Sequence, residues 1–195
     1  MSEVLELQGI MVRVPSSMDL EELEAMRADV IVAPPEGPER ALAEVIASRT
    51  SAGLVHHVRP RRALYQAIAY PSSSFGKVVV GVDPGKTCAA VAVADGLVVW
   101  LWRGDCVDLP VEVDMLRDDA PSREFQVYVG FGWGGEEAAA SLRGVGFEVR
   151  GVPEEGSTTL PYHAPAGLLE AIDDEHVLAA LTIAYRGLTG WPRRI

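Results

Sequence analysis

Asparagine is absent from the sequence, and lysine is nearly so, with two lysines against fifteen arginines in 195 residues. The loss of a thermolabile amide side chain is typical of heat-adapted proteins, whereas a shortage of lysine is not part of that pattern. A GC-rich genome would explain the arginine bias equally well. The composition is therefore compatible with a thermophile and does not require one.

Cysteine is also scarce. The only two, Cys88 and Cys106, exclude a scaffold built on several disulfides and a zinc site with four thiolate ligands. One bridge between them is compatible with the sequence, but it is not the default in a reducing cytosol. The sequence leaves the state of this pair open.

Long hydrophobic runs are missing. The longest apolar stretches, at residues 78–82 and 97–102, have the length of a strand, and a membrane-spanning helix needs about 20 apolar residues. The first eight residues carry two glutamates and no basic segment, which is not the pattern of a signal peptide. We therefore expect a soluble cytoplasmic protein with no membrane partner.

Negative charge dominates, with a net charge of −11, while 48% of the residues are hydrophobic, enough to build a core. Residues 1–75 carry −3 and residues 76–195 carry −8. A uniformly acidic protein is repelled by phosphate backbones, which argues against casual binding of nucleic acid. The acidic excess of the second half is either a solvated face or a set of carboxylates gathered around metal.

The first 75 residues alternate between strand and helix patterns. We expect strands at 9–14, 29–33 and 53–58, and helices at 16–27, 36–49 and from 60 onward. Ser16 and Asp19 have the spacing of a capping box at the start of the first helix. This repetition predicts a small, mostly parallel sheet covered by helices. The linker-like segment 71–76 predicts a boundary between a small α/β domain, 1–75, and a second domain, 76–195.

The second domain opens with a valine-rich strand, 77–82, that ends at Asp83. A hairpin follows, because Asp95-Gly96 is a strong turn signal between two apolar strands. The full expected order is strands at 77–82, 88–94 and 97–102, at most a short helix within 104–124, a strand at 126–130, a helix at 134–143, a strand at 147–152 and a long helix at 166–185. This is the element order of the ribonuclease-H-like fold. It predicts a mixed five-stranded sheet in which the strand ending at Asp83 is central and antiparallel to 88–94.

Asp83 is the first candidate for chemistry. A carboxylate that ends a buried strand is costly to desolvate unless it is paired or bound to metal, although an aspartate at this place also commonly caps a turn. The segment approaches the phosphate-binding pattern GxxxxGK[ST], but that pattern needs glycine at position 80, where the chain has Val80. A phosphate-binding loop of that type is therefore not expected.

Two further acidic groups follow later in the chain. Glu154 and Glu155 precede three hydroxyl residues after the fifth strand, which suits metal or phosphate contacts or a plain surface loop. The group 173–176, Asp-Asp-Glu-His, lies in the first half of the last helix, where acids also complement the helix dipole. Helical spacing directs His176 toward the sheet. In this element order the three groups converge at one edge of the sheet, where two Mg²⁺ ions would neutralise them.

These motifs resemble a known family. The sequence Gly81-Val82-Asp83-Pro84-Gly85 followed by a hairpin resembles the opening of the Holliday-junction resolvase RuvC and its YqgF relatives, in the ribonuclease-H-like superfamily. Segments 129–132 and 152–159 are similar to YqgF-type proteins, which have glycine in place of a catalytic glutamate after strand four and an acidic pair before threonines after strand five. The segment 176–184 resembles the RuvC motif His-x-x-Asp-Ala-Leu-x-Ile-Ala, with Ala179 in place of the aspartate. The resemblance covers about residues 77–188.

The resemblance implies a metal-dependent nuclease that hydrolyses phosphodiester bonds in structured DNA or RNA by a two-metal mechanism with Mg²⁺ or Mn²⁺. The implied catalytic residues are Asp83, Glu155, Asp174 and His176, and the implied metal ligands are Asp83, Glu155, Asp173 and Asp174. Because Ala179 replaces the last-helix aspartate, either an acid of 173–175 or His176 itself completes the site. Candidate contacts to nucleic acid are Arg59, Arg61 and Arg62 of the basic patch 56–62, together with Lys86. A homodimer is compatible with this assignment.

Two alternatives remain. Ala179 favours a degenerate member that kept the fold and binds nucleic acid or protein without cleaving. Asp83 to Thr87 also fits the pattern Asp-x-Gly-x-Thr of ATPases of the actin and sugar-kinase type, but those enzymes need two such domains around a cleft, and this chain has room for one. Trp133 and the other tryptophans are expected in the core or an interface rather than as platforms for base stacking.

Overall fold

The computed structural model describes residues 5–153 and 166–190. Packing divides the chain into two units. The N-terminal unit consists of residues 12–75 and 118–121, and the sheet unit consists of the described residues among 1–11, 76–117 and 122–195. That each unit folds as a domain of its own, divided at residue 75, stays a prediction.

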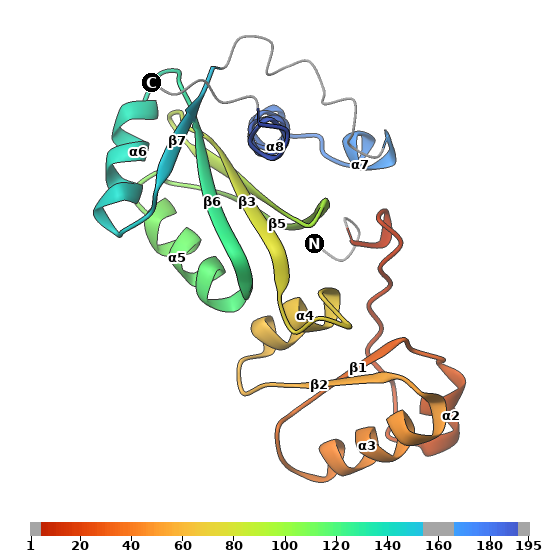
Figure 1. The fold of residues 1–195 in the computed structure, drawn as a ribbon. Helices are drawn as coiled ribbons and strands as arrows, with labels where there is room; N and C mark the ends of the chain where they lie inside the picture. The colour runs from red at the N-terminus through yellow and green to blue at the C-terminus, as the bar shows by residue number, and fades with distance from the viewer. Residues whose placement is uncertain (1–4, 154–165, 191–195) are drawn as a thin grey trace. The chain divides into compact units, whose positions relative to one another are not determined.

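The N-terminal unit contains a two-stranded parallel sheet with helices. Its elements are α2 (Leu20–Ala25), β1 (Val30–Ala33), α3 (Pro38–Thr50), β2 (Gly53–His56) and α4 (Pro60–Ile68) (Figure 1). In the sheet, Val30 of β1 lies opposite Gly53 of β2. Both α3 and α4 begin with proline, which suits a first helical position because the N–H that proline lacks has no partner there.

Two expectations for this unit are wrong. Residues 10–15 form no strand, and Met11 and Val14 are exposed, so their apolar side chains do not create a face that a sheet could bury. The first helix starts at Leu20 rather than at residue 16. Asp19 is its N-cap, since its carboxylate accepts the backbone N–H groups of Glu21 and Glu22, whereas the Ser16 hydroxyl donates to the Glu22 carboxylate.

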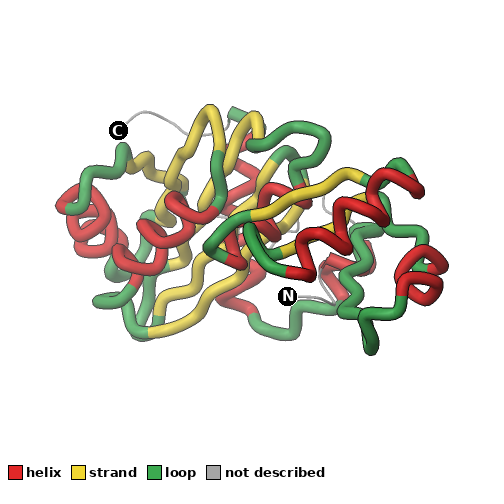
Figure 2. The backbone as a smooth tube through the Cα atoms, turned by 90° about the horizontal axis from the view of Figure 1, so that it is seen from below, coloured by secondary structure: helices red, strands yellow, loops and turns green. Residues whose placement is uncertain are grey.

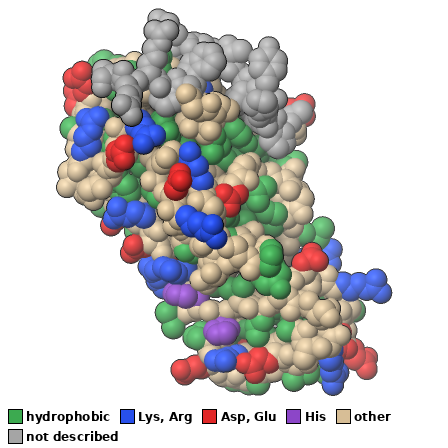
Figure 3. Space-filling model, in the orientation of Figure 1, with side chains coloured by type: hydrophobic (Ala, Val, Ile, Leu, Met, Phe, Trp, Pro, Cys, Tyr) green, Lys and Arg blue, Asp and Glu red, His purple; other side chains and the backbone are tan. Residues whose placement is uncertain are grey.

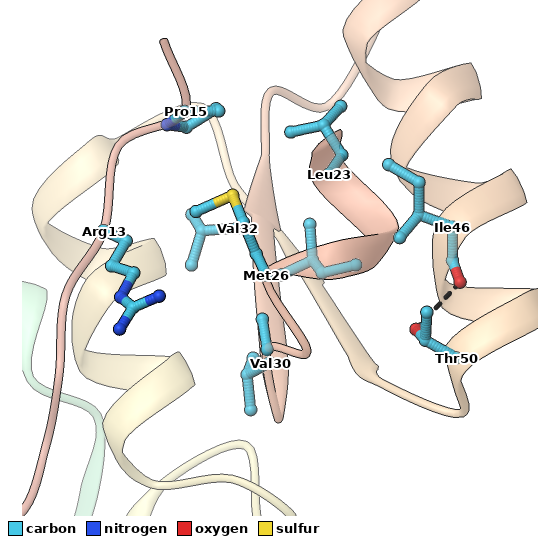
Figure 4. A pocket seen from close by; sticks show the side chains of 10 residues that line it. Arg13, Pro15, Leu23, Met26, Val30, Val32, Ile46 and Thr50 are labelled. Carbon is cyan, nitrogen blue, oxygen red and sulfur yellow. Dashed lines mark hydrogen bonds between the residues drawn. The ribbon is translucent and has the colours of Figure 1, made fainter. Parts of the chain in front are cut away.

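An apolar cavity of about 140 Å³ lies within the N-terminal unit (Figure 4). Leu23 and Met26 line it beside β1 and α3, and Arg13 carries the one charged side chain among its lining residues. Apolar walls of this kind fill space or hold an apolar group, and they bring no pair of titratable groups together. The cavity therefore adds no catalytic chemistry.

The sheet unit is built on five strands, β3 (Phe75–Asp83), β4 (Cys88–Ala94), β5 (Leu97–Gly104), β6 (Ser122–Gly130) and β7 (Val149–Val152). Their order is β5-β4-β3-β6-β7, so the strand that ends at Asp83 is central (Figure 1). Figure 2 shows the strands of the chain in yellow and the helices in red. Strand β4 is antiparallel to β3 and to β5, while β7 is parallel to β6. This mixed five-stranded sheet flanked by helices confirms the predicted fold class.

Helices cover both faces of this sheet. They are α5 (Leu109–Asp119), α6 (Gly135–Gly144), α7 (Ala166–Glu170) and α8 (Glu175–Leu188), with α5 and α6 on one side and α8 on the other (Figure 1). Helix α5 is longer than expected, because Pro110 lies in its first turn and Pro121 follows its end, two places where proline does not break a helix. The expected single helix over 166–185 is instead divided into α7 and α8. Within the described part of the chain, no helix is both long and apolar enough to span a bilayer.

Helix α8 lies directly on the central strand. An added Cβ at Gly81 would lie 2.2 Å from the carbonyl oxygen of Ala180 and 2.3 Å from the backbone nitrogen of Ala184. The missing side chain of Gly81 and the small side chains of the two alanines allow this close approach. Val79, two residues earlier on the same face of β3, packs in the same core cluster as Ala180 and Ala184. The spacing between α8 and β3 is therefore set at Gly81.

Two local connections complete the sheet unit. The side-chain amide of Gln8 pairs with the backbone of Val98 on β5, donating to its carbonyl at 3.0 Å and accepting its N–H at 2.7 Å. Cys88 and Cys106 form a disulfide, which is the pairing that the sequence left open. The bridge ties the first residue of β4 to the turn between β5 and α5.

Candidate functional site

Asp83 stands at the carboxyl end of the central strand and is only 9% exposed. It points toward α8, because it shares a face of β3 with Gly81, against which α8 packs. Burial raises the pKa of this carboxyl group above its usual value. The hydrogen bond and charge of His176 act in the opposite direction, and the nearby negative charges of Asp174 and Glu175 raise the pKa further. Asp83 is thus a desolvated carboxyl group whose ionised form is incompletely compensated.

His176 is the partner of Asp83. Its Nδ1 lies 2.9 Å from Oδ2 of Asp83, and its side chain is 40% exposed. His176 precedes Ala180 by one helical turn, so the close contact of Ala180 with Gly81 brings the imidazole over the end of β3. With its proton on Nδ1, the ring donates to Asp83 and presents an unprotonated Nε2. The pair therefore places a carboxylate oxygen and an imidazole nitrogen side by side at the carboxyl end of the central strand.

Asp174 serves the helix rather than the pair. Its Oδ1 accepts the backbone N–H groups of His176 and Val177 at 2.9 and 3.2 Å, which makes it the N-cap of α8, and its Oδ2 pairs with Arg103 of β5. Burial tends to raise the pKa of Asp174, but these two N–H groups and the Arg103 guanidinium outweigh it and hold the pKa below its usual value. An acid that we assigned to metal binding is thus already engaged in orienting the first turn of α8.

Two other residues are expected as metal ligands. Asp173 is exposed, and Glu155 lies outside the described residues. Within the described residues, 5–153 and 166–190, no three or more His, Cys, Asp or Glu side chains are grouped so that they could hold a metal ion. The described part of the chain therefore offers two donors, Asp83 and His176, and a complete metal site needs at least one more.

These two donors suit a divalent cation. Carboxylate oxygen is the preferred ligand of Mg²⁺ and Mn²⁺, and imidazole nitrogen is an accepted one for Mn²⁺. A cation beside Asp83 would stabilise the ionised carboxylate, which burial disfavours.

The ends of three strands lie close together near this pair. Strand β7 ends at Val152, the register partner of Gly130 at the end of β6, and an added Cβ at Gly135 would lie 3.8 Å from Pro84, which follows β3. The ends of β3, β6 and β7 therefore meet at one edge of the sheet.

Two loops lie beside this pair. Residues 84–87 follow Asp83, and residues 131–134 follow β6. An added Cβ at Gly134 would lie 4.0 Å from the backbone nitrogen of Gly85, so the loops are neighbours. Lys86 is exposed on the first loop, and Trp133, which we expected in the core or an interface, is 77% exposed on the second. A cationic side chain and an aromatic ring are thus exposed on the two neighbouring loops, one of which follows Asp83 directly.

The basic patch lies in the N-terminal unit and is largely engaged there. Arg59 and Arg62 donate to the backbone carbonyl of Asp118, at 3.0 and 2.8 Å, and Arg59 and Arg61 pair with the carboxylate of Asp119, at 3.4 and 3.7 Å. About half of the Arg59 and Arg61 side chains remains exposed. On the face shown in Figure 3, acidic and basic side chains are interspersed. A role of these arginines in binding nucleic acid stays a prediction.

Comparisons with models of protein families and with curated proteins found no match. Among solved structures, the chain is similar to RuvC of T. thermophilus in complex with a Holliday junction substrate. The identity is 17%, the match covers 61% of this chain and 99% of that chain, and the TM-score is 0.42. At this identity and TM-score, the comparison assigns neither an activity nor a substrate to the chain.

Sequence reasoning missed Arg103 and the capping role of Asp174. The second had a readable signal, because aspartate is a preferred N-cap and Asp174 directly precedes Glu175 and the apolar run of α8. The disulfide had a signal as well, because the hairpin turn at Asp95-Gly96 brings Cys88 near Cys106. In the observed register, Cys88 lies opposite Gly104, two residues from Cys106. Arg103 had none, because its contact with Asp174 joins residues 71 positions apart.

Proposed function

We propose that the chain is a metal-dependent nuclease that hydrolyses phosphodiester bonds in structured DNA or RNA. The observation that carries this proposal is the contact of Asp83 with His176 at the end of the central strand. The resemblance of the segments around Asp83 and His176 to RuvC supports it, since both residues match positions of the motifs of that family. The incompletely compensated charge of buried Asp83 supports a cation as a further partner.

In this proposal Asp83 and His176 are the ligands from the described residues, and Glu155 supplies another. Two divalent cations, when bound, polarise the attacking water and stabilise the leaving oxygen. His176 orients Asp83 through Oδ2, which leaves Oδ1 for a cation. Because Asp83 must be ionised to bind a cation, its raised pKa makes binding weaken as the pH falls through that value.

The substrate would be held by the two exposed loops. Lys86 offers a positive charge to a phosphate, and Trp133 offers a flat ring on which a base can stack. The chain as a whole is acidic, so such contacts must act locally against the repulsion of its surface. Binding should therefore weaken strongly with added salt and depend on few cationic side chains.

A scaffold without catalysis is the second candidate, and two observations favour it. Ala179 stands where the resembled RuvC motif has an aspartate. Asp174, the N-cap of α8, already accepts the first backbone N–H groups of the helix and pairs with Arg103. A protein of this kind would bind structured nucleic acid or another protein without needing metal.

The test is the thermal response of the full chain to Mn²⁺, combined with cleavage of branched DNA and of structured RNA. Binding at about 100 times Kd adds about 2.7 kcal/mol to stability. For a chain of this size that corresponds to a rise in Tm of about 5–10 °C. We expect this rise in the wild type and its loss in Asp83→Asn, together with the loss of cleavage. Asp29→Asn, a matched exposed aspartate of the N-terminal unit, should behave as the wild type.

The outcomes separate the two candidates. A Mn²⁺ response without cleavage of either substrate would retain the metal site and reject the nuclease. Binding of branched DNA or structured RNA with neither a Mn²⁺ response nor cleavage would support the scaffold. An equal Mn²⁺ response in the wild type and in Asp83→Asn would remove Asp83 from the site.

A further inference from the structure

The disulfide lies next to the candidate site. Cys88 is the first residue of β4, five positions after Asp83, and Cys106 lies in the turn between β5 and α5. The Sγ atom of Cys106 lies 3.3 Å from the carbonyl oxygen of Gly85. One sulfur of the bridge therefore closes the loop 84–87 at its carboxyl end, and the other contacts the loop backbone.

The loop 84–87 is the connection between β3 and β4. It connects Asp83 to Ala89, which are the last register partners of β3 and β4, and Lys86 at its centre is exposed. On its other side it neighbours the loop after β6, because an added Cβ at Gly134 would lie 4.0 Å from the backbone nitrogen of Gly85, and Pro84 is buried. The bridge is thus the covalent restraint on a segment that carries Lys86 and begins beside Asp83.

Reduction can reach this bridge from one end. Cys88 is fully buried, whereas Cys106 is partly exposed, in a turn where Val107 is 80% exposed. A dithiol reductant attacks the Cys106 sulfur as a thiolate, the S–S bond breaks, and Cys88 leaves as a thiolate and takes up a proton. The second thiol of the reductant then displaces Cys106, which also takes up a proton. The products are two cysteine thiols and the oxidised, disulfide form of the reductant.

We propose that the Cys88–Cys106 bridge is a redox switch for the candidate site. The oxidised form holds the loop 84–87 against the turn at Cys106 and keeps Lys86 and the neighbouring Asp83 in place. The reduced form releases the loop, which lowers its order and weakens the binding of a divalent cation at Asp83. The effect on the cation rests on the proposed function, whereas the effect on the loop does not.

The experiment compares the oxidised full chain with the same protein after reduction by dithiothreitol and removal of the reagent under anaerobic conditions. Thiol titration in denaturant should find no free thiol before reduction and two after it. Hydrogen exchange of the amides at 85–88 should become faster on reduction, on the order of tenfold, while amides of α3 stay unchanged. Cys106→Ser should exchange rapidly at 85–88 from the start and should not respond to the reductant.

The affinity for Mn²⁺ is measured on the same samples. Loss of a group that orients a metal ligand costs about 10–100-fold in affinity, and we expect the reduced form to bind about tenfold more weakly. Two free thiols before reduction, or equal exchange in the two forms, would overturn the switch. Equal Mn²⁺ affinity in both forms would do the same. If neither form binds Mn²⁺ while exchange responds to reduction, the restraint of the loop stands and the proposed function fails.

Discussion

The contact of Gly81 with α8 predicts a large effect from one added methyl group. In Gly81→Ala the new Cβ would lie 2.2 Å from the Ala180 oxygen, and ordinary contact begins at 3.4 Å. The neighbouring atoms are helix backbone, which cannot rotate away as a side chain can, so α8 must move by about 1.2 Å, the difference between these two distances. Overpacking a core costs about 1–3 kcal/mol, and a backbone clash belongs at the top of that range. We expect a loss of about 3 kcal/mol, or about 6–12 °C in Tm.

Two other glycines calibrate this expectation. A Cβ at Gly187, in α8, would lie 2.5 Å from the ring of Tyr128, which is a clash with a buried side chain rather than with helix backbone. A Cβ at Gly144, the last residue of α6, would meet nothing within 4 Å. Replacing a helical glycine by alanine in open space stabilises by about 0.5–1 kcal/mol. The order of stability should therefore be Gly144→Ala above wild type, then Gly187→Ala, then Gly81→Ala.

The assay is unfolding in urea, monitored by circular dichroism, on the wild type and the three variants. A stability of Gly81→Ala equal to that of the wild type would refute the reasoning, because it would show that α8 does not rest on β3 at this point. The movement of α8 in Gly81→Ala would also draw His176 away from Asp83. We therefore expect Gly81→Ala to lose its Mn²⁺ response at a temperature where it is still folded, whereas Gly144→Ala keeps that response.

Three further predictions concern the edge of the sheet. The pKa of Asp83 is raised in the folded protein, so the wild type loses stability as the pH rises through that pKa. Without metal, the stability of Asp83→Asn relative to the wild type should therefore increase with pH. A difference in urea midpoints that does not depend on pH would contradict this. The pKa of Asp174 is lowered, so the stability that its carboxylate contributes is lost as the pH falls. Asp174→Ala should therefore cost about 1 kcal/mol of stability at neutral pH and less in acid. An equal cost at both pH values would show that neither the N-cap nor the pair with Arg103 is the source of the effect. In fluorescence titrations with branched DNA, Lys86→Ala should reduce the salt dependence by about one counterion, and Trp133→Ala should cost about 1–3 kcal/mol at every salt concentration; unchanged binding in both would place the nucleic acid elsewhere.

The sheet could be predicted from the sequence because its signals are local. A run of valines, the Asp95-Gly96 turn and the spacing of apolar residues in the later helices each depend on neighbours in the chain. Those signals led to the correct central strand. Where two local signals competed, the prediction was wrong, as at Asp174, whose preference for an N-cap outweighed the helical spacing that continues through it.

The site could be predicted only in part, because its contacts are not local. Asp83 and His176 were found separately, one from a strand end and the other from a helix face, and their contact spans 93 positions. Arg59 and Arg61 form ion pairs with Asp118 and Asp119, which lie more than 50 positions later in the chain. The sequence alone therefore did not show that these arginines have acidic partners. The close packing of α8 on β3 depends on the missing side chain of Gly81, and the spacing of apolar residues does not reveal such a contact.

The side chain of Gln8 bears on how the outer edge of the sheet is covered. Strand β5 is an outer strand of the sheet, and the backbone N–H and carbonyl of Val98 would otherwise be ready to accept a strand from another molecule. The carboxamide has one donor group and one acceptor, so it pairs with Val98 as a neighbouring strand would, but it offers no further backbone for the ladder to continue. Residue 8 thus ends the sheet where an unprotected edge would invite aggregation.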